Sequence, residues 1–133
     1  MLDLALYYGK GPILLKDVAM RQEIPLRYLE QLIAPLKATG LVKSTRGAKG
    51  GYVLSKAPPE IKLSEIIHAL EGSIAPVECV IHPKVCRRSE NCVTRDVWVE
   101  IYQTINGILE SLTLEELIKR HNKKQPSVVE YHI

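Results

Sequence analysis

A glycine-rich turn that directly follows an amphipathic helix constrains the fold of this chain most strongly. The turn, residues 46–51, reads R-G-A-K-G-G and lies between two short apolar runs, the spacing of a β-hairpin. Before it, apolar residues recur every three or four positions over residues 29–36 and predict a helix that ends at Gly40. A shorter helical pattern covers residues 14–24. Two helices joined by a tight turn and followed by a hairpin predict a winged helix-turn-helix.

The second half of the chain shows helical patterns only. Over residues 93–111 an apolar residue recurs almost every fourth position. At 1.5 Å per residue this helix is about 28 Å long, which is more than a small winged domain can cover. A second copy of the same helix is the economical cover, so we expect a two-fold homodimer. A last short helix begins after Thr113, and the residues after Gln125 read as an arm.

The predicted fold class is mainly α with a small β-hairpin wing. Residues 1–57 form a winged helix-turn-helix DNA-binding head, and residues 58–133 carry a cysteine loop at 79–92, the dimerisation helix and a C-terminal arm. The first helix opens without a capping residue, so we expect it to begin before Met1. We find no apolar run of about 18 residues and no secretory leader, so we expect no membrane partner. Three cysteines without a leader favour a cytoplasmic protein.

Basic residues are concentrated in the first half of the chain. Residues 1–56 hold nine Lys and Arg against four Asp and Glu, whereas residues 57–133 hold nine against eleven. A basic head on a mildly acidic body favours a polyanion as partner, and a solvated surface is the alternative. The residues that we expect to contact double-stranded DNA lie on the second helix and in the wing: Arg27, Tyr28, Glu30, Gln31, Arg46 and Lys49.

All three cysteines of the chain, Cys79, Cys86 and Cys92, fall in one loop. Zinc sites usually contain close C-x-x-C pairs, which this loop lacks, whereas wider spacing suits an iron–sulfur cluster. His82 is a candidate fourth ligand, and the alternatives are a carboxylate, a residue from an N-terminal stretch that precedes Met1, or a partner-subunit residue. A metal-free, redox-reactive thiol loop also remains open. The carboxylates considered are Glu78, Glu90 and Asp96.

The chain resembles the Rrf2 family of winged-helix regulators, which includes IscR, NsrR, RirA and CymR. The matching motifs are Y-L-E-Q-L from Tyr28, R-G-x-x-G-G-Y from Arg46, L-S-E-I-I-H-A-L-E-G from Leu63, and the three-cysteine loop followed by V-T-R-D-V-W. The resemblance implies a dimeric transcription regulator whose cysteines hold a cluster. It also implies that the polar residues of the second helix face the major groove and Arg46 the minor groove.

The familiar fourth ligands of the family do not carry over. IscR-like members place a histidine where this chain has Arg95, and NsrR-like members use a carboxylate in an N-terminal stretch that this sequence lacks. We expect a 2Fe–2S rather than a 4Fe–4S cluster, and a loop that packs between the long helix and the head when the cluster is bound.

The expected function is transcription regulation at a palindromic operator, with no enzyme activity. The signal would be iron or cluster status, redox state or nitric oxide. The alternative is a cluster-free member that regulates cysteine or sulfur metabolism through reactive thiols or a protein partner. A protein-interaction module without DNA contact is the competing class. An enzyme is disfavoured because the chain has no Ser-His-Asp set and no phosphate-binding glycine loop after a strand.

Overall fold

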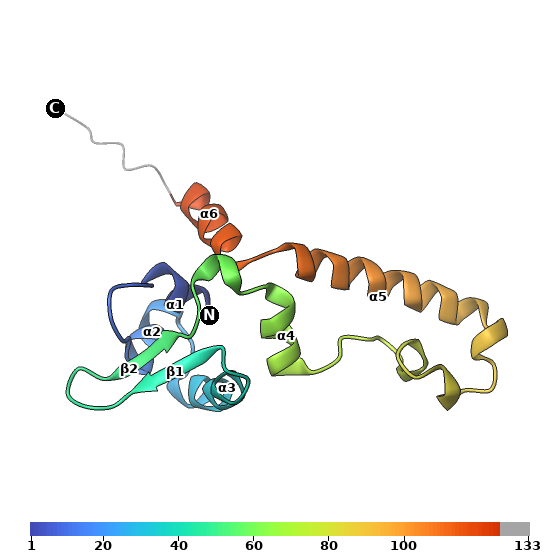
Figure 1. Ribbon diagram of the computed structural model, residues 1–133, viewed down its shortest axis with the longest axis horizontal. Helices are drawn as coiled ribbons and strands as arrows, with labels where there is room; N and C mark the ends of the chain where they lie inside the picture. Colours follow the sequence, from blue (N-terminus) through green and yellow to red (C-terminus); the bar gives the residue numbers. More distant parts are fainter. Residues whose placement is uncertain (126–133) are drawn as a thin grey trace.

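The winged helix-turn-helix forms at the N-terminal end of the chain, as predicted (Figure 1). A computed structural model describes residues 1–125, so the predicted arm after Gln125 lies outside the described residues. Three helices, a two-stranded antiparallel sheet and the connections between them make up this region. In chain order these are α1 (Leu2–Leu6), α2 (Leu15–Gln22), α3 (Leu26–Ala38), β1 (Val42–Thr45) and β2 (Gly51–Leu54).

The turn between α2 and α3 is tight. Glu23 ends α2 with a left-handed φ of 53°, and Pro25, directly before α3, is extended. The hairpin pairs Val42 with Leu54 and Thr45 with Gly51. The connection between α1 and α2 adds a third segment to this sheet through an isolated bridge between Ile13 and Tyr52.

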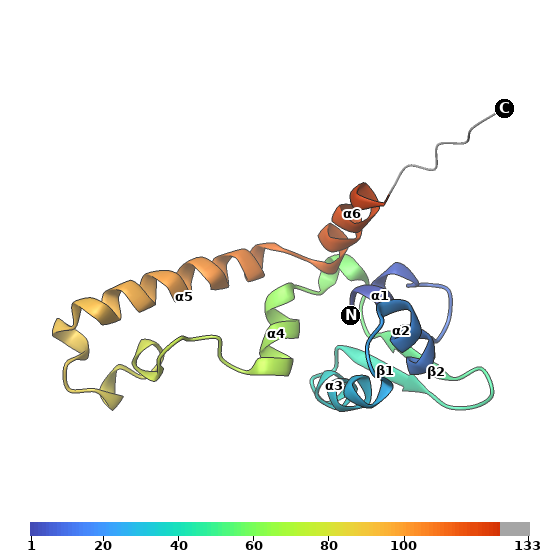
Figure 2. The same ribbon diagram turned by 180° about the vertical axis from the view of Figure 1, so that it is seen from behind.

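The second half of the chain leaves the winged region and returns to it. It contains α4 (Leu63–Glu71), α5 (Val93–Ser111) and α6 (Leu114–Lys124), together with four short 3₁₀ turns. The turns are η1 (Pro58–Glu60), η2 (Glu78–Val80), η3 (Pro83–Val85) and η4 (Ser89–Asn91). The structure confirms the predicted long helix as α5, which projects away from α1–α3 in both views (Figure 1 and Figure 2).

One apolar core joins the two ends of the described chain. Leu36 of α3 and Leu54 of β2 share it with Ile66 of α4 and Leu114 of α6. Ile61 and Leu114 are its two fully buried large side chains, each with 0% exposure. The helices α4 and α6 therefore pack on the winged region, although the predicted head ends at residue 57.

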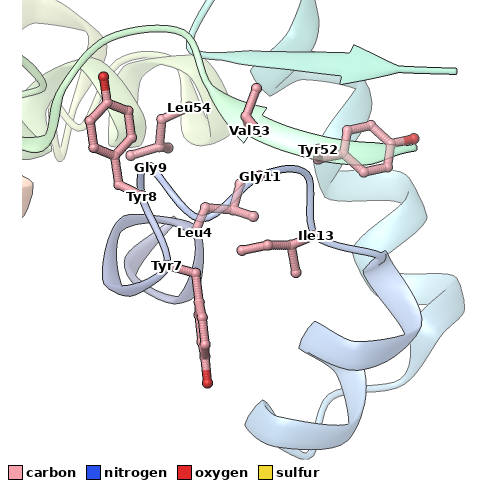
Figure 3. Close-up of a pocket in the computed structure, with 9 residues that line it drawn as sticks. All are labelled: Leu4, Tyr7, Tyr8, Gly9, Gly11, Ile13, Tyr52, Val53 and Leu54. Atoms are coloured by element: carbon pink, nitrogen blue, oxygen red, sulfur yellow. The ribbon is translucent and has the colours of Figure 1, made fainter. Parts of the chain in front are cut away.

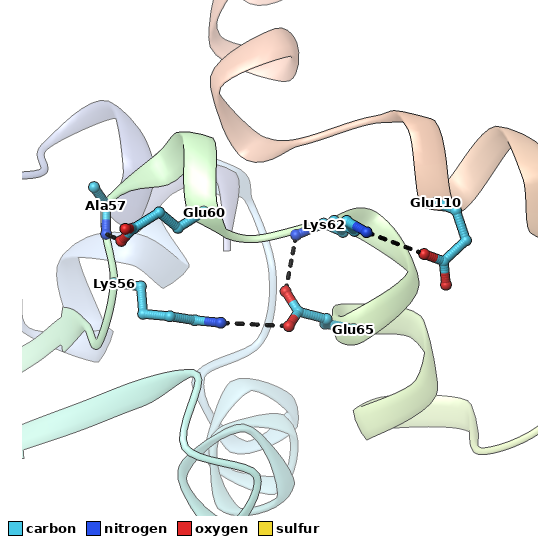
Figure 4. Close-up of polar contacts among 6 residues, drawn as sticks. All are labelled: Lys56, Ala57, Glu60, Lys62, Glu65 and Glu110. Atoms are coloured by element: carbon cyan, nitrogen blue, oxygen red, sulfur yellow. Dashed lines mark hydrogen bonds and ion pairs between the residues drawn. The ribbon is translucent and has the colours of Figure 1, made fainter.

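The base of α5 is fixed where two segments cross. The Leu63 amide donates a 2.9 Å hydrogen bond to the Leu112 carbonyl, and the Leu114 amide donates a 3.0 Å bond to the Ile61 carbonyl. A Lys62–Glu110 ion pair of 3.4 Å lies beside this crossing (Figure 4). Both of its side chains are about half exposed, so the backbone bonds contribute more to the geometry than this ion pair does.

The helix α5 buries no residue fully within the single chain. Four apolar residues of its predicted stripe are 39–54% exposed: Val97, Ile101, Ile105 and Ile108. Within residues 1–125, no helix has the length and apolar character needed to cross a membrane.

Candidate nucleic-acid interface and cysteine loop

The helix α3 presents its predicted DNA-contacting residues to solvent. Arg27, Tyr28, Glu30 and Gln31 are all exposed in its first two turns. Leu29 and Ile33, on the other side of the helix, pack against the core, and Leu36 is part of it. The amphipathic spacing thus fixes which face of α3 is free, as a groove-reading helix requires.

The wing places two exposed cations, Arg46 and Lys49, at the tip of the hairpin. The hairpin is compact because two of its glycines, Gly50 and Gly51, leave no room for a side chain. A Cβ atom on Gly50 would lie 2.3 Å from the Thr45 carbonyl oxygen, and one on Gly51 would lie 2.5 Å from that of Ile13. The structure brings α3 and this tip to the side of the winged region away from α6 (Figure 1).

The second strand of the wing borders a pocket of about 270 Å³ (Figure 3). Its lining comes from α1, from the connection to α2 and from β2, and includes Tyr7, Tyr8 and Tyr52. None of its lining residues is charged, so the pocket is uncharged, whereas the tip of the hairpin carries two cations.

A buried carboxylate fixes the helix that precedes the helix-turn-helix turn. Asp3 of α1 accepts hydrogen bonds of 3.0 and 2.7 Å from Arg21 and one of 3.0 Å from Gln22, at the end of α2. Burial alone would raise the pKa of Asp3, but these hydrogen bonds and the Arg21 charge outweigh it and hold the pKa below its ordinary value. The hydrogen bond to Asp3 raises the pKa of Arg21, whose guanidinium also stacks 4.4 Å above the Tyr7 ring.

The cysteine loop consists mainly of η2, η3 and η4. Cys79 and Cys92 are half-buried, Cys86 is exposed, and all three are free thiols. Cys92 is the N-cap of α5, where its Sγ accepts a 3.4 Å hydrogen bond from the Arg95 amide. The buried Ser89 donates a 2.6 Å hydrogen bond from its hydroxyl to the Pro83 carbonyl and closes the turn that carries Cys86.

The loop lies at the end of α5 that is farthest from α1–α3 (Figure 2). Its main contact with a helix is that of η2 with α5. In the single chain the loop therefore does not lie between the long helix and the head, and its expected packing there when the cluster is bound stays a prediction. The physical reason is the length of α5, which carries the loop about 28 Å from its base.

The structure does not gather the predicted metal ligands. Within residues 1–125, no group of three or more His, Cys, Asp or Glu side chains is arranged to hold a metal ion. His82 is exposed and precedes η3, with its amide bonded to the Glu78 carbonyl at 2.9 Å. The donor set nevertheless has the chemistry of a thiolate-bound cluster, with exposed Lys84 and Arg87 near Cys86 to offset negative charge.

The exposed face of α3 and the cationic wing define a winged-helix DNA-binding transcription regulator, and comparison with known proteins agrees. The chain belongs to the Rrf2 family, described as "Iron-dependent Transcriptional regulator", whose family model matches residues 1–120. It is 40% identical to the HTH-type transcriptional regulator CymR of Bacillus subtilis (strain 168) over 98% of this chain and 90% of that protein. It is 42% identical to the HTH-type transcriptional regulator IscR of Photorhabdus laumondii over 89% of this chain and 71% of that protein.

Solved structures give the same result. The structure of CymR, called the global cysteine regulator of B. subtilis, aligns with a TM-score of 0.77 at 41% identity and covers 90% of this chain and 87% of that one. The structure of T. potens IscR aligns with a TM-score of 0.77 at 39% identity and covers 98% and 87%. The predictions of a winged-helix fold, of this family and of a non-enzymatic regulator are thereby confirmed.

Proposed function

We propose that this protein is a homodimeric regulator that binds a palindromic operator and senses its signal through an iron–sulfur cluster on the loop 79–92. The observation that carries the proposal is the position of Cys92. This residue ends the cysteine loop and caps α5, so whatever orders the loop acts on the end of that helix. Iron or cluster status, redox state and nitric oxide are the signals that such a cluster would report.

DNA recognition in this proposal divides between α3 and the wing. Gln31 and Arg27 have the donors and acceptors that pair with adenine and guanine edges, and Glu30 can accept from cytosine. Tyr28 reaches phosphate, while Arg46 and Lys49 enter the adjacent minor groove. Their exposure, on a helix and a hairpin tip that both lie away from α6 (Figure 1), supports this assignment.

The dimer would form along α5. A stripe of exposed apolar side chains on a helix is unfavourable in water, and burying it against the same stripe of a second copy removes that cost. A two-fold pair also presents two recognition helices to two half-sites, about 34 Å apart.

Cys79, Cys86 and Cys92 would hold the cluster. When bound, the cluster supplies a redox-active and oxygen-sensitive group, for which a 2Fe–2S form is the proposal. His82 is the candidate for the fourth position. The protein's own residues cap the α5 helix, hold the turn around Ser89 and keep basic side chains near the thiols. Free thiols also fit a cytoplasmic location.

The alternative is a cluster-free regulator of cysteine or sulfur metabolism that works through reactive thiols or a protein partner. Two observations favour it: the similarity to CymR and the finding that, within residues 1–125, no three His, Cys, Asp or Glu side chains are arranged to hold a metal ion. Cys86, the exposed thiol, would then be the reactive one.

Anaerobic purification distinguishes the cluster-binding regulator from the cluster-free alternative. The cluster proposal requires a coloured protein that contains iron and sulfide in equal amounts, and it requires that Cys86→Ala abolish both. Ser73→Ala, in an exposed position just before the loop, is the matched control and should retain them. A colourless parent protein that still binds its operator in a thiol-dependent manner would establish the cluster-free alternative.

A further inference from the structure

One residue contacts both the first and the last cysteine of the loop. The Nε of Arg95 donates a 3.1 Å hydrogen bond to the Cys79 carbonyl, which lies 16 positions earlier in the chain. The backbone amide of the same residue donates the 3.4 Å bond to the Cys92 Sγ. Arg95 is half-buried, unlike Arg87 and Arg88, which are exposed.

We propose that Arg95 is a positioning residue that fixes the backbone of Cys79 to the first turn of α5, the helix that Cys92 caps, before any cluster is bound. This inference rests on the proposed cluster function for its purpose, but the contact that carries it belongs to the metal-free protein. The backbones of two of the three cysteines are then already fixed at the start of α5, and Cys86 is the ligand that moves to complete the set.

Arg95 cannot itself be a ligand. A guanidinium stays protonated and has no free lone pair with which to coordinate iron. Arg95 is suited to positioning because the donors of its planar guanidinium lose little conformational entropy when they form hydrogen bonds. The position that holds a histidine in IscR-like relatives therefore serves here to fix the loop and not to bind metal.

The rest of the loop is consistent with this division of roles. Among the described residues, the Arg95–Cys79 bond is the side-chain hydrogen bond that joins the start of the loop to α5. The turn from Pro83 to Ser89 closes on itself through the Ser89 hydroxyl, and no side-chain hydrogen bond of the described chain ties it to α5. Cys86 therefore sits on a small unit that can shift without breaking a side-chain hydrogen bond to the helix.

Prearrangement matters because closing a flexible loop costs conformational entropy, and a ligand set that is already partly closed does not have to lose that entropy on binding. A chain without the Arg95 contact would have to bring three independent thiols together. The cost would appear as weaker retention of the cluster and as greater solvent access to Cys79 in the metal-free protein.

Alkylation of the metal-free protein tests the contact directly. Each cysteine is followed by mass spectrometry during reaction with iodoacetamide, in the parent, in Arg95→Met and in Arg88→Met. Arg95→Met keeps the apolar stem and removes the donor, whereas Arg88→Met removes an equal charge from an exposed position. We expect Arg95→Met to raise the rate at Cys79 several-fold, with Cys86 unchanged, and Arg88→Met to leave Cys79 unchanged.

The direction of the change in alkylation rate distinguishes a positioning role of Arg95 from an effect of its charge alone. Loss of a nearby positive charge disfavours the thiolate and slows alkylation, whereas release of the loop exposes the thiols and speeds it. Unchanged or slower reaction of Cys79 in Arg95→Met would overturn the proposal. Far-UV circular dichroism and the thermal midpoint verify that both variants fold.

A second measurement uses the reconstituted protein. We expect Arg95→Met to lose its cluster to an iron chelator about tenfold faster than the parent, a factor in keeping with the loss of one charge-assisted hydrogen bond. Equal release rates would contradict the positioning role. If neither protein takes up iron, the cluster function fails, while the alkylation result still decides whether Arg95 holds Cys79 in place.

Discussion

The Tyr52 amide donates a 2.8 Å hydrogen bond to the Ile13 carbonyl, and the Ile13 amide donates a 3.0 Å bond back to the Tyr52 carbonyl. This reciprocal pair ties the second strand of the wing to the connection between α1 and α2 (Figure 3). The wing is therefore held against the helix-turn-helix at its base, while its cationic tip extends free of that contact.

Gly51→Ala should weaken the wing. Gly51 has a φ of 153°, and an added Cβ would lie 2.5 Å from the Ile13 carbonyl oxygen. We expect a loss of unfolding free energy of at least about 1 kcal/mol, measured by urea denaturation, together with weaker operator binding. Gly107→Ala is the control, because it lies in α5 with open space around it and should stabilise the chain by up to about 1 kcal/mol. Equal stability of the Gly51 variant and the parent would contradict the packing described for the wing.

Arg46→Ala should reduce both DNA affinity and its salt dependence. If the side chain lies in the minor groove, its removal lowers the slope of log affinity against log salt by about one and relaxes preference at an A·T-rich position. Titration of operator and random duplexes at several salt concentrations measures this. Lys119→Ala removes an exposed charge from α6, away from the wing, and should leave the slope unchanged. A parental slope and specificity in Arg46→Ala would show that the wing does not contact DNA.

Ile105→Glu should separate the dimer. Ile105 is 42% exposed in the middle of the apolar stripe of α5, and a carboxylate buried between two such helices would carry a large desolvation cost. Light scattering coupled to gel filtration should change from dimer to monomer, and affinity for the palindromic operator should fall. Gln103→Glu introduces the same charge on the opposite face of α5 and should remain dimeric. A dimeric Ile105→Glu protein would mean that another surface forms the dimer.

Acid should destabilise the protein in part through Asp3. The pKa of Asp3 in the folded chain lies below its ordinary value of 3.8, so its contribution to stability is complete above that value and is lost as the pH falls through the folded-state pKa. Asp3→Asn should lower the unfolding free energy by about 1–2 kcal/mol near neutral pH, a modest loss because Arg21 is one-third exposed. The variant should also show a flatter decline in acid. A parallel decline of both proteins below about pH 4 would assign acid sensitivity to other groups.

Sequence patterns predicted the regular elements well because those elements depend on local periodicity. The stripe over residues 93–111 coincides with the observed bounds of α5, and the glycine-rich turn gives the wing. Contacts between distant segments leave no such trace. The bridge from Ile13 to Tyr52, the burial of Leu114 in the head and the bond from Arg95 to Cys79 depend on how the chain returns on itself.

The cysteine loop was the least predictable part. Its three short 3₁₀ turns have no apolar repeat that would predict them. The spacing of the three cysteines along the sequence indicates a metal or redox role, but it does not determine where the thiols lie relative to one another. No sequence pattern indicates the hydrogen bond from the Arg95 side chain to the Cys79 carbonyl. The sequence shows only that Arg95 lies in the first turn of the predicted long helix.

The complete burial of Leu114 has a consequence for synthesis of the chain. The core around Ile61 receives this side chain from α6, after the whole of the cysteine loop and α5. A ribosome produces the chain from its N-terminus, so α3 emerges before the residue of α6 that completes the core on which α3 packs. The order of translation therefore places the synthesis of all three cysteines before that of the side chain that completes the core, so the winged region reaches its full packing only after the cysteine loop has been made.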